Sequence, residues 1–321
     1  MQPINITSYS CLSERKLNYT QMEVRIICHE VICFLLRVTG APWLLREVIG
    51  KNKITIVNYH KVTAERFEEH IKLFSKLYSF VSIDEVQLAL EEKNFKDLPS
   101  KPLVVSFDDG HASNAKLFEI IERRGVPVVI YVVAGVVGTN RRLWFDVVPK
   151  NDRRKLRLEE LSDENRRLIL KQHYMHEDDK EYSNSDYLSW SDLNKVLNVG
   201  GSIGSHTLTH PILNRCSPEM GNYECEESKI LLESKLHINI RHFAYPRGAY
   251  DIRCAHWLKA AGYKTARTIN PGWVTRSSDP FILPNFGVSD NAGENKAIVQ
   301  ASGLWDIIKN PFVIFRWIFS R

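Results

Sequence analysis

The sequence lacks a long hydrophobic run. Its longest apolar stretch near the N-terminus, VICFLL at residues 31–36, is bounded by Glu30 and Arg37, whereas a bilayer-spanning helix needs roughly 20 apolar residues. The first twenty residues are polar and mixed, so the pattern of a secretory signal is missing too. We therefore expect a cytoplasmic location, with membrane contact only as a peripheral association at the inner face.

Strong charge and paired cysteines are also lacking. The net charge of +5 over 321 residues is mild and not gathered into basic patches, which argues against a nucleic-acid partner. The six cysteines, at positions 11, 28, 33, 216, 225 and 254, form no CxxC pair. This excludes a zinc ribbon and a thioredoxin-like motif, and predicts free thiols in a reducing compartment.

From residue 54 the sequence alternates short β-branched runs with helical periods. The predicted strands cover residues 54–59, 103–107, 128–133, 202–205, 241–245 and 264–268. They show almost no polar alternation, which predicts a parallel sheet covered on both faces. We divide the chain into an amphipathic helical extension (1–52), an α/β domain (53–290) with a charged helical insertion at about 139–190, and an apolar, basic tail (291–321).

The two ends of the chain carry unusual apolar segments. Residues 21–49 are predicted to be helical, with a wide apolar face and a break at residues 40–42, and the tail GLWDIIKNPFVIFRWIFSR is aromatic and basic. We expect residues 21–49 and 304–321 to make peripheral contact with a membrane. Docking of the tail on the core or on a partner is the alternative.

Two constellations carry the chemistry. Asp108 and Asp109 follow the strand VVSF, and His206 and His210 follow the strand SIGS. In a parallel sheet both groups lie at the carboxyl edge, where ligands bind. The i, i+4 spacing predicts that the imidazoles share one side of a single turn. Two imidazoles and one carboxylate suit a catalytic Zn²⁺, and the other carboxylate would accept a proton from water. A helix cap is the alternative for the aspartates.

A third stretch, RHFAYPRGAYD at residues 241–251, places Pro-Arg-Gly after a predicted strand. Backbone N–H groups in such a bend can stabilise an oxyanion. An ordinary proline-containing loop is the alternative.

SFDDG, SHTLTH and FAYPRG, in this order, closely resemble the signature motifs of the polysaccharide deacetylase family, also known as carbohydrate esterase family 4 or the NodB homology domain. The resemblance covers roughly residues 53–290. It implies a distorted (β/α) barrel, here with flanking N- and C-terminal helical segments. It also implies hydrolysis of N- or O-acetyl groups on an acetylated saccharide with a divalent metal, commonly Zn²⁺.

Matched residue by residue, the resemblance makes Asp108 the general base and Asp109, His206 and His210 the metal ligands. Arg247 stands where the family has a residue whose backbone N–H helps to hold the oxyanion.

Two departures from the family pattern concern catalysis. Ala244 occupies the position of an arginine that orients the base in many members, and the late histidine that supplies the general acid is missing from FILPNFGVSD. We expect His60, at the end of the first predicted strand, to act as the acid, with a structural histidine as an equal alternative. His111 is a second choice, more typical of a helix start.

Three functions remain open at this stage. The first is a metal-dependent deacetylase in surface-glycan or lipid-linked saccharide biosynthesis. The second is a hydrolase of non-sugar amide bonds on the same fold. The third is a metal- or glycan-binding pseudoenzyme, suggested by the two departures. Trp144 and Trp273 are either sugar-stacking walls or core aromatics.

Overall fold

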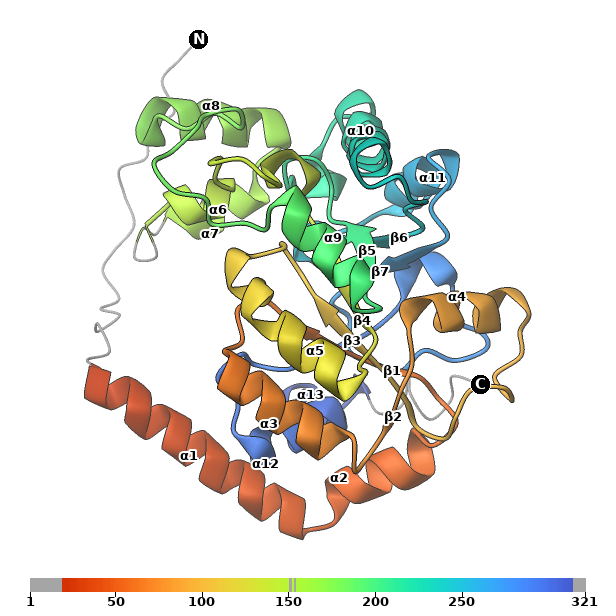
Figure 1. Ribbon diagram of the computed structural model, residues 1–321. Coiled ribbons are helices and arrows are strands. Elements are labelled where there is room, and N and C mark those ends of the chain that lie inside the picture. The colour runs from red at the N-terminus through yellow and green to blue at the C-terminus, as the bar shows by residue number, and fades with distance from the viewer. Residues whose placement is uncertain (1–18, 150–151, 153, 314–321) are drawn as a thin grey trace.

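The computed structural model describes residues 19–149, 152 and 154–313. Its centre is an eight-stranded sheet (Figure 1) in which the strands pair in the order β7-β6-β5-β4-β3-β1-β8, with β2 beside β3. Every one of these pairings is parallel. The strands are β1 (Thr55–Tyr59), β2 (Ser79–Phe80), β3 (Pro102–Phe107), β4 (Val128–Val132), β5 (Ser202–Ser205), β6 (His242–Ala244), β7 (Thr265–Arg267) and β8 (Phe286–Gly287).

The sheet forms a half-barrel wrapped by helices, which confirms the predicted fold class. The α-helices are α1 (Tyr19–Val38), α2 (Ala41–Leu44), α3 (Ala64–Phe74), α4 (Ile83–Glu91), α5 (Phe118–Arg124), α6 (Trp144–Val147), α7 (Arg154–Glu160), α8 (Asp163–Tyr174), α9 (Trp190–Asn198), α10 (Pro218–Leu236), α11 (Ile252–Ala260), α12 (Glu294–Ala301) and α13 (Leu304–Lys309). A π-helical turn, Leu45–Ile49, continues α2, and short 3₁₀ turns complete the connections.

Both faces of the sheet are buried, as the lack of polar alternation predicts. Strands β1, β3 and β4 are buried along their whole length. In β1, Val57 and Tyr59 belong to the large core cluster that includes side chains of α3 and α5, whereas Ile56 belongs to a second, smaller cluster with Val104 and Tyr131. The alternation of side chains along each strand therefore fills two cores rather than one core and a solvated face.

The helix starts follow the sequence signals. Capping boxes form at Ser82–Glu85 and Ser189–Asp192, and Ser217 caps α10 with Pro218 in its first turn. Strands β2 and β8 were not predicted, because each contains only two residues and leaves no periodic pattern.

The flanking segments lie together. Helix α1 packs along α12 on the outside of the half-barrel (Figure 1). Cys33 and Leu45 share a buried cluster there with Val299 and Leu304. Among the described helices no single one is long and apolar enough to cross a membrane. Two consecutive segments, Ile26–Val38 and Ala41–Ile49, reach that length and hydropathy only together and are bent by 65°. The domain boundaries stay predictions.

The described cysteines are all free thiols, as expected. Cys33, Cys216, Cys225 and Cys254 are buried and Cys28 is exposed. Cys11 lies outside the described residues.

Candidate active site

The turn after β3 separates the two adjacent aspartates. Asp109 and Gly110 both adopt left-handed backbone angles, with φ of 67° and 68°. At Gly110 a Cβ atom would lie only 2.7 Å from Val132 Cγ1, so this position needs glycine for space as well as for conformation. The turn gives Asp108 and Asp109 different partners, which is how two neighbouring carboxylates can serve different roles.

Asp109 meets the two histidines after β5. Its Oδ1 atom lies 3.6 Å from His206 Nε2 and 3.5 Å from His210 Nε2. One ligand atom from each of the three residues lies within 4.8 Å of the others, and all three residues are buried. The structure thus brings together the three ligands that the sequence predicts.

The predicted single turn for the histidines is wrong. Strand β5 ends at Ser205, and residues 206–210 form a loop in which Thr207 and His210 have φ of 70° and 63°. Left-handed backbone is uncommon for residues other than glycine and is typical of functional sites. The two imidazoles therefore come together through an irregular loop, and their rings meet edge to face with 4.8 Å between centroids.

Two contacts hold the imidazoles in place. His206 Nδ1 lies 2.7 Å from the carbonyl oxygen of Ala244, so this nitrogen carries the proton and Nε2 is left as a ligand. The Phe145 ring packs edge-on against His210 at 4.8 Å between centroids. The Trp144 indole N–H donates to the His210 carbonyl at 3.0 Å, so buried Trp144 supports the loop and is not a sugar-stacking wall.

A carboxylate that sequence reasoning missed anchors the same loop. Glu224, buried on α10, accepts hydrogen bonds from the backbone N–H groups of Leu208 and Thr209, both at 2.9 Å, and from the Thr209 hydroxyl at 2.5 Å. Burial raises the pKa of Glu224 above its ordinary value despite these bonds. Only the folded topology reveals this role, because Glu224 sits in an otherwise ordinary helical sequence.

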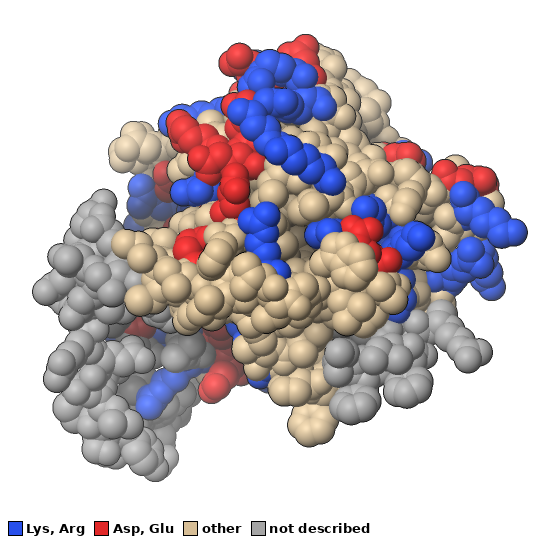
Figure 2. Space-filling model, turned by 90° about the horizontal axis from the view of Figure 1, so that it is seen from below, with Lys and Arg blue, Asp and Glu red and all other residues tan. Residues whose placement is uncertain are grey.

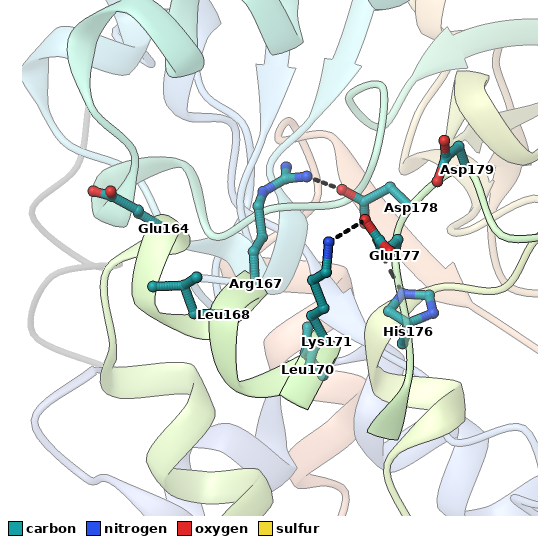
Figure 3. Close-up of a pocket in the computed structure, with 9 residues that line it drawn as sticks. All are labelled: Glu164, Arg167, Leu168, Leu170, Lys171, His176, Glu177, Asp178 and Asp179. Atoms are coloured by element: carbon teal, nitrogen blue, oxygen red, sulfur yellow. Dashed lines mark hydrogen bonds and ion pairs between the residues drawn. The ribbon is translucent and has the colours of Figure 1, made fainter. Parts of the chain in front are cut away.

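The inserted helices α6–α8 also contact the loop. Arg167 of α8 donates to Thr209 Oγ1 at 3.0 Å and lies 3.4 Å from Glu224. Figure 3 shows Arg167 reaching from α8 to Asp178, beside a cavity of about 420 Å³. Lys171 points across the same cavity to Glu177 at 3.1 Å. The cavity's bases are therefore paired with its acids, and none of the three ligands lines it.

Asp108 is held by residues from two other strands. Arg267, at the end of β7, donates to Asp108 Oδ1, and Asn58 of β1 donates to Oδ2 at 3.0 Å. Burial alone would raise the pKa of Asp108, but the Arg267 guanidinium and the nearby imidazoles hold it well below the usual range. Arg267 pairs in register with Ala244, so an arginine from the neighbouring strand stands beside the position where the family motif has its own.

The remaining candidates lie around this centre. His60 Nε2 is 3.9 Å from Asp108 Oδ2, and the imidazole is half exposed. His111 caps the next 3₁₀ turn by accepting from the Ser113 N–H at 3.2 Å, which is the helix-start role. Arg247 has a left-handed backbone, with φ of 58°, and its side chain pairs with Glu159 of α7. Trp273 is buried against Phe286 and is a core aromatic.

The three ligand residues fit a divalent cation. Burial and the adjacent Asp108 raise the pKa of Asp109, while burial lowers the pKa of His210 and favours its neutral, metal-binding form. A buried carboxylate without a cationic partner is costly, and a cation between Asp109 and the imidazoles would supply that partner. Two nitrogens and one oxygen leave a position open for water.

The half-barrel thus carries a buried His-His-Asp set, which could hold a divalent cation, beside a second carboxylate that could act as a base. The family model for polysaccharide deacetylase matches residues 95–266, more than half of the chain. The chain therefore belongs to the polysaccharide deacetylase family, and this membership supports hydrolytic deacetylation of a saccharide.

Individual relatives are distant. The chain is 23% identical over 247 residues to YxkH of Bacillus subtilis (strain 168), which carries the family's name, with 74% of this chain and 72% of YxkH covered. Streptococcus pyogenes deacetylase PplD, solved in complex with acetate, is 19% identical with a TM-score of 0.59, covering 78% of this chain and 98% of PplD. IcaB from Ammonifex degensii is 17% identical with a TM-score of 0.58, covering 78% and 97%. These two structures support the fold.

Proposed function

We propose that this protein is a metal-dependent deacetylase that removes N-acetyl or O-acetyl groups from a saccharide. The observation that carries the proposal is the convergence of Asp109, His206 and His210 within 4.8 Å, next to Asp108, whose charge is held by Arg267. The ligand chemistry favours Zn²⁺, since two imidazoles and one carboxylate suit a borderline cation. When bound, such a cation would acidify water and polarise the acetyl carbonyl.

Asp108 and His60 would then carry the two proton transfers of the reaction. Asp108 accepts a proton from the attacking water, because its low pKa keeps the carboxylate ionised at neutral pH. The Arg247 backbone N–H follows Pro246 in the bend after β6 and would donate to the developing oxyanion. His60, half exposed and 3.9 Å from Asp108, would donate a proton to the leaving group. Asn58 and Arg267 keep Asp108 oriented while this occurs.

The pseudoenzyme alternative was suggested by two departures from the family motifs, the missing arginine and the missing late histidine. The chain has an arginine at Asp108 and a histidine at the edge of the site, although each comes from a different position than in the family motifs. The product released distinguishes deacetylation from hydrolysis of non-sugar amides. Deacetylation releases acetate, whereas amide hydrolysis releases ammonia or an amine together with a different acid.

The test compares wild-type protein with His206→Ala and Asp108→Asn. We expect near-stoichiometric metal in the wild type and in Asp108→Asn, and little metal in His206→Ala. Acetate release from N-acetylglucosamine oligomers and from O-acetylated sugars should be lost in both variants. Full activity of Asp108→Asn would exclude Asp108 as the base, and a wild type that takes up no metal would exclude the proposal.

We also propose that the reaction takes place in the cytoplasm, at the inner face of the membrane, on a lipid-linked or nucleotide-linked saccharide made for the cell surface. Support for membrane proximity comes from the exposed apolar side chains of α1 and α2. Protease accessibility of the native chain in intact and in lysed protoplasts checks this location, and digestion in intact protoplasts would contradict it.

A further inference from the structure

The N-terminal helices expose a continuous apolar face. Nine large side chains of α1, α2 and the π-helical turn are between 48% and 64% exposed. We call this set the apolar face; its members are Ile27, Val31, Ile32, Phe34, Leu35, Val38, Trp43, Leu44 and Val48. Ile308 and Phe312 of the adjoining C-terminal segment are exposed as well. These eleven make up more than half of the eighteen large apolar side chains exposed in the described chain.

Helix α1 exposes apolar side chains that a helix covering a protein core would bury. Two of its described polar side chains bond to the protein: Glu30 accepts from the Gly293 N–H at 2.6 Å, and Arg37 donates to Asn295 Oδ1 at 3.0 Å. Among the side chains described for α1, those of residues 26–38, only Cys33 and the partly buried Leu36 join the cluster shared with α12 and α13. An amphipathic helix in a soluble domain normally turns its apolar stripe inward. Here most of that stripe is turned outward.

The surroundings of the apolar face carry little negative charge. Glu30 is bonded as described, and Glu47 pairs with Arg46 at 2.7 Å and Lys101 at 3.0 Å. On these segments the exposed charged side chains among the described residues are Arg37, Lys51 and Lys309, all basic. Exposed Glu294, at the start of the adjoining α12, is the acid beside them. Figure 2 views the molecule from the side where α1 and α2 lie in Figure 1 and shows a broad uncharged area there.

We propose that the apolar face lies on the surface of an anionic lipid membrane. Apolar side chains enter the acyl boundary while basic residues meet the headgroups, which is how interfacial helices bind. The described chain ends at Val313, which is packed in the cluster beneath this face. The sequence that follows, IFRWIFSR, contains aromatic and basic residues and no acidic one.

A lipid surface fits better than a protein partner. Protein interfaces use about one hydrogen bond per 100–200 Å². The side chains of the apolar face are Ile, Val, Leu, Phe and Trp, and these offer almost no hydrogen-bond donors or acceptors to a partner. The hydroxyl of Thr39, at its centre between α1 and α2, already donates to the Leu36 carbonyl at 2.6 Å. Contiguous exposed apolar area of this kind marks an interaction site rather than ordinary surface. The inference does not depend on the proposed deacetylation.

The test is flotation of the full chain with two vesicle types, pure phosphatidylcholine and phosphatidylcholine mixed with phosphatidylglycerol. We expect flotation with the mixed vesicles and weaker flotation when salt screens the basic residues. The variant Leu35→Glu/Phe34→Glu should bind at least about tenfold more weakly, because it loses two inserted side chains and adds charge. The matched control is Leu88→Glu, which changes a leucine of similar exposure on α4.

The outcomes separate the possible occupants. Circular dichroism and metal content should be unchanged in all variants, because the substituted side chains are exposed. Absence of flotation of the wild type with either vesicle would overturn the proposal. A concentration-dependent dimer that Leu35→Glu/Phe34→Glu dissociates, together with unaltered flotation of that variant, would also overturn it in favour of a second copy of the chain. Acetate release from a soluble saccharide should be equal in wild type and variant.

Discussion

Arg267, at the end of β7, donates a hydrogen bond to Asp108, which follows β3, four positions away in the sheet. Both residues are almost completely buried, and the guanidinium also lies over the Tyr131 ring at 5.2 Å. The proposed base is thus fixed by a charge that the SFDDG segment itself does not contain.

Replacing Arg267 should damage both the activity and the stability. Arg267→Met leaves the Asp108 carboxylate buried without its main cation, which typically costs about 3–5 kcal/mol of unfolding free energy. The pKa of Asp108 should rise, so the acidic limb of the kcat/KM profile should move to higher pH, since the base works only when ionised. Arg267→Lys should recover part of the effect.

The double variant Asp108→Asn/Arg267→Met is the control for Arg267. It removes both charges, so much of the lost stability should return while the activity stays absent. Chemical denaturation and pH–rate profiles measure the two effects. An unchanged pH profile in Arg267→Lys and Arg267→Met would show that Arg267 has only a structural role.

His60→Gln should lower kcat by about 10²–10⁴-fold, the usual contribution of a general acid. The metal content should not change, because His60 is not among the three ligands. The control is His111→Gln, which removes a cap of a 3₁₀ turn and should leave kcat near that of the wild type. Equal activity of both variants would assign the proton donor elsewhere.

Glu224→Gln should weaken the affinity for the metal without removing a ligand. A glutamine can replace one accepting oxygen but not both, so the 206–210 loop loses hydrogen bonds from Leu208 and Thr209 or from the Thr209 hydroxyl. Loss of such outer contacts typically costs 10–100-fold in affinity, so we expect about that change. Metal titration of the chelated protein gives this value directly, and kcat at saturating metal should stay near wild type.

Glu226→Gln is the control for Glu224, because it lies two residues further along α10 and is exposed. If both variants bind metal like the wild type, the contacts from α10 do not position the loop.

Asp84 should make the free energy of unfolding fall as the pH is lowered into the acid range. It accepts from His242 at 2.9 Å, from Arg241 at 2.5 Å and from Ser202 at 3.0 Å. The His242 bond is the main cause that lowers the pKa of Asp84 from 3.8 to about 2. Because the folded pKa lies below the unfolded one, the stabilisation is complete above about pH 4 and disappears as the pH falls towards 2.

Asp84→Asn should therefore cost about 1–2 kcal/mol at neutral pH, a value reduced for the partial exposure of the carboxylate. The difference in unfolding free energy between wild type and variant should shrink between pH 4 and pH 2. Urea denaturation at a series of pH values measures it. A difference that stays constant over this range would contradict the prediction.

The sequence predicts the fold and the residues of the Asp109, His206 and His210 cluster because both depend on local signals. The β-branched runs, the capping serines and the short motifs around Asp108 and His206 can each be identified within a few residues. Residues whose role comes from register or topology cannot be found this way. Arg267 lies in an ordinary strand pattern, and only its pairing with Ala244 and the path of β7 bring it to Asp108. Glu224 likewise depends on how α10 packs behind the loop.

The helical turn expected for His206 and His210 was wrong for a related reason. A spacing of four residues fits a helix, but it also fits a loop with left-handed residues at Thr207 and His210. Periodicity over five residues cannot separate the two, and the hydrogen bonds that Leu208 and Thr209 donate to Glu224 stabilise the loop. The role of His60 stays a prediction that His60→Gln tests, and the role of the Arg247 backbone N–H stays a prediction.

The contact of Arg167 with Thr209 has a consequence for engineering this family. Besides Trp144 and Phe145 of α6, which contact His210, the Arg167 guanidinium of α8 joins the insertion to the 206–210 loop. The same guanidinium bonds Asp163 of its own helix and meets Glu224 of α10. A graft of this insertion onto another scaffold would therefore have to carry Arg167, Thr209 and Glu224 as one transferable unit. A graft that exchanges only residues 139–190 would transfer Arg167 without Thr209 and Glu224. The loop of the recipient that corresponds to residues 206–210 would then lack the hydrogen bond that Arg167 makes here.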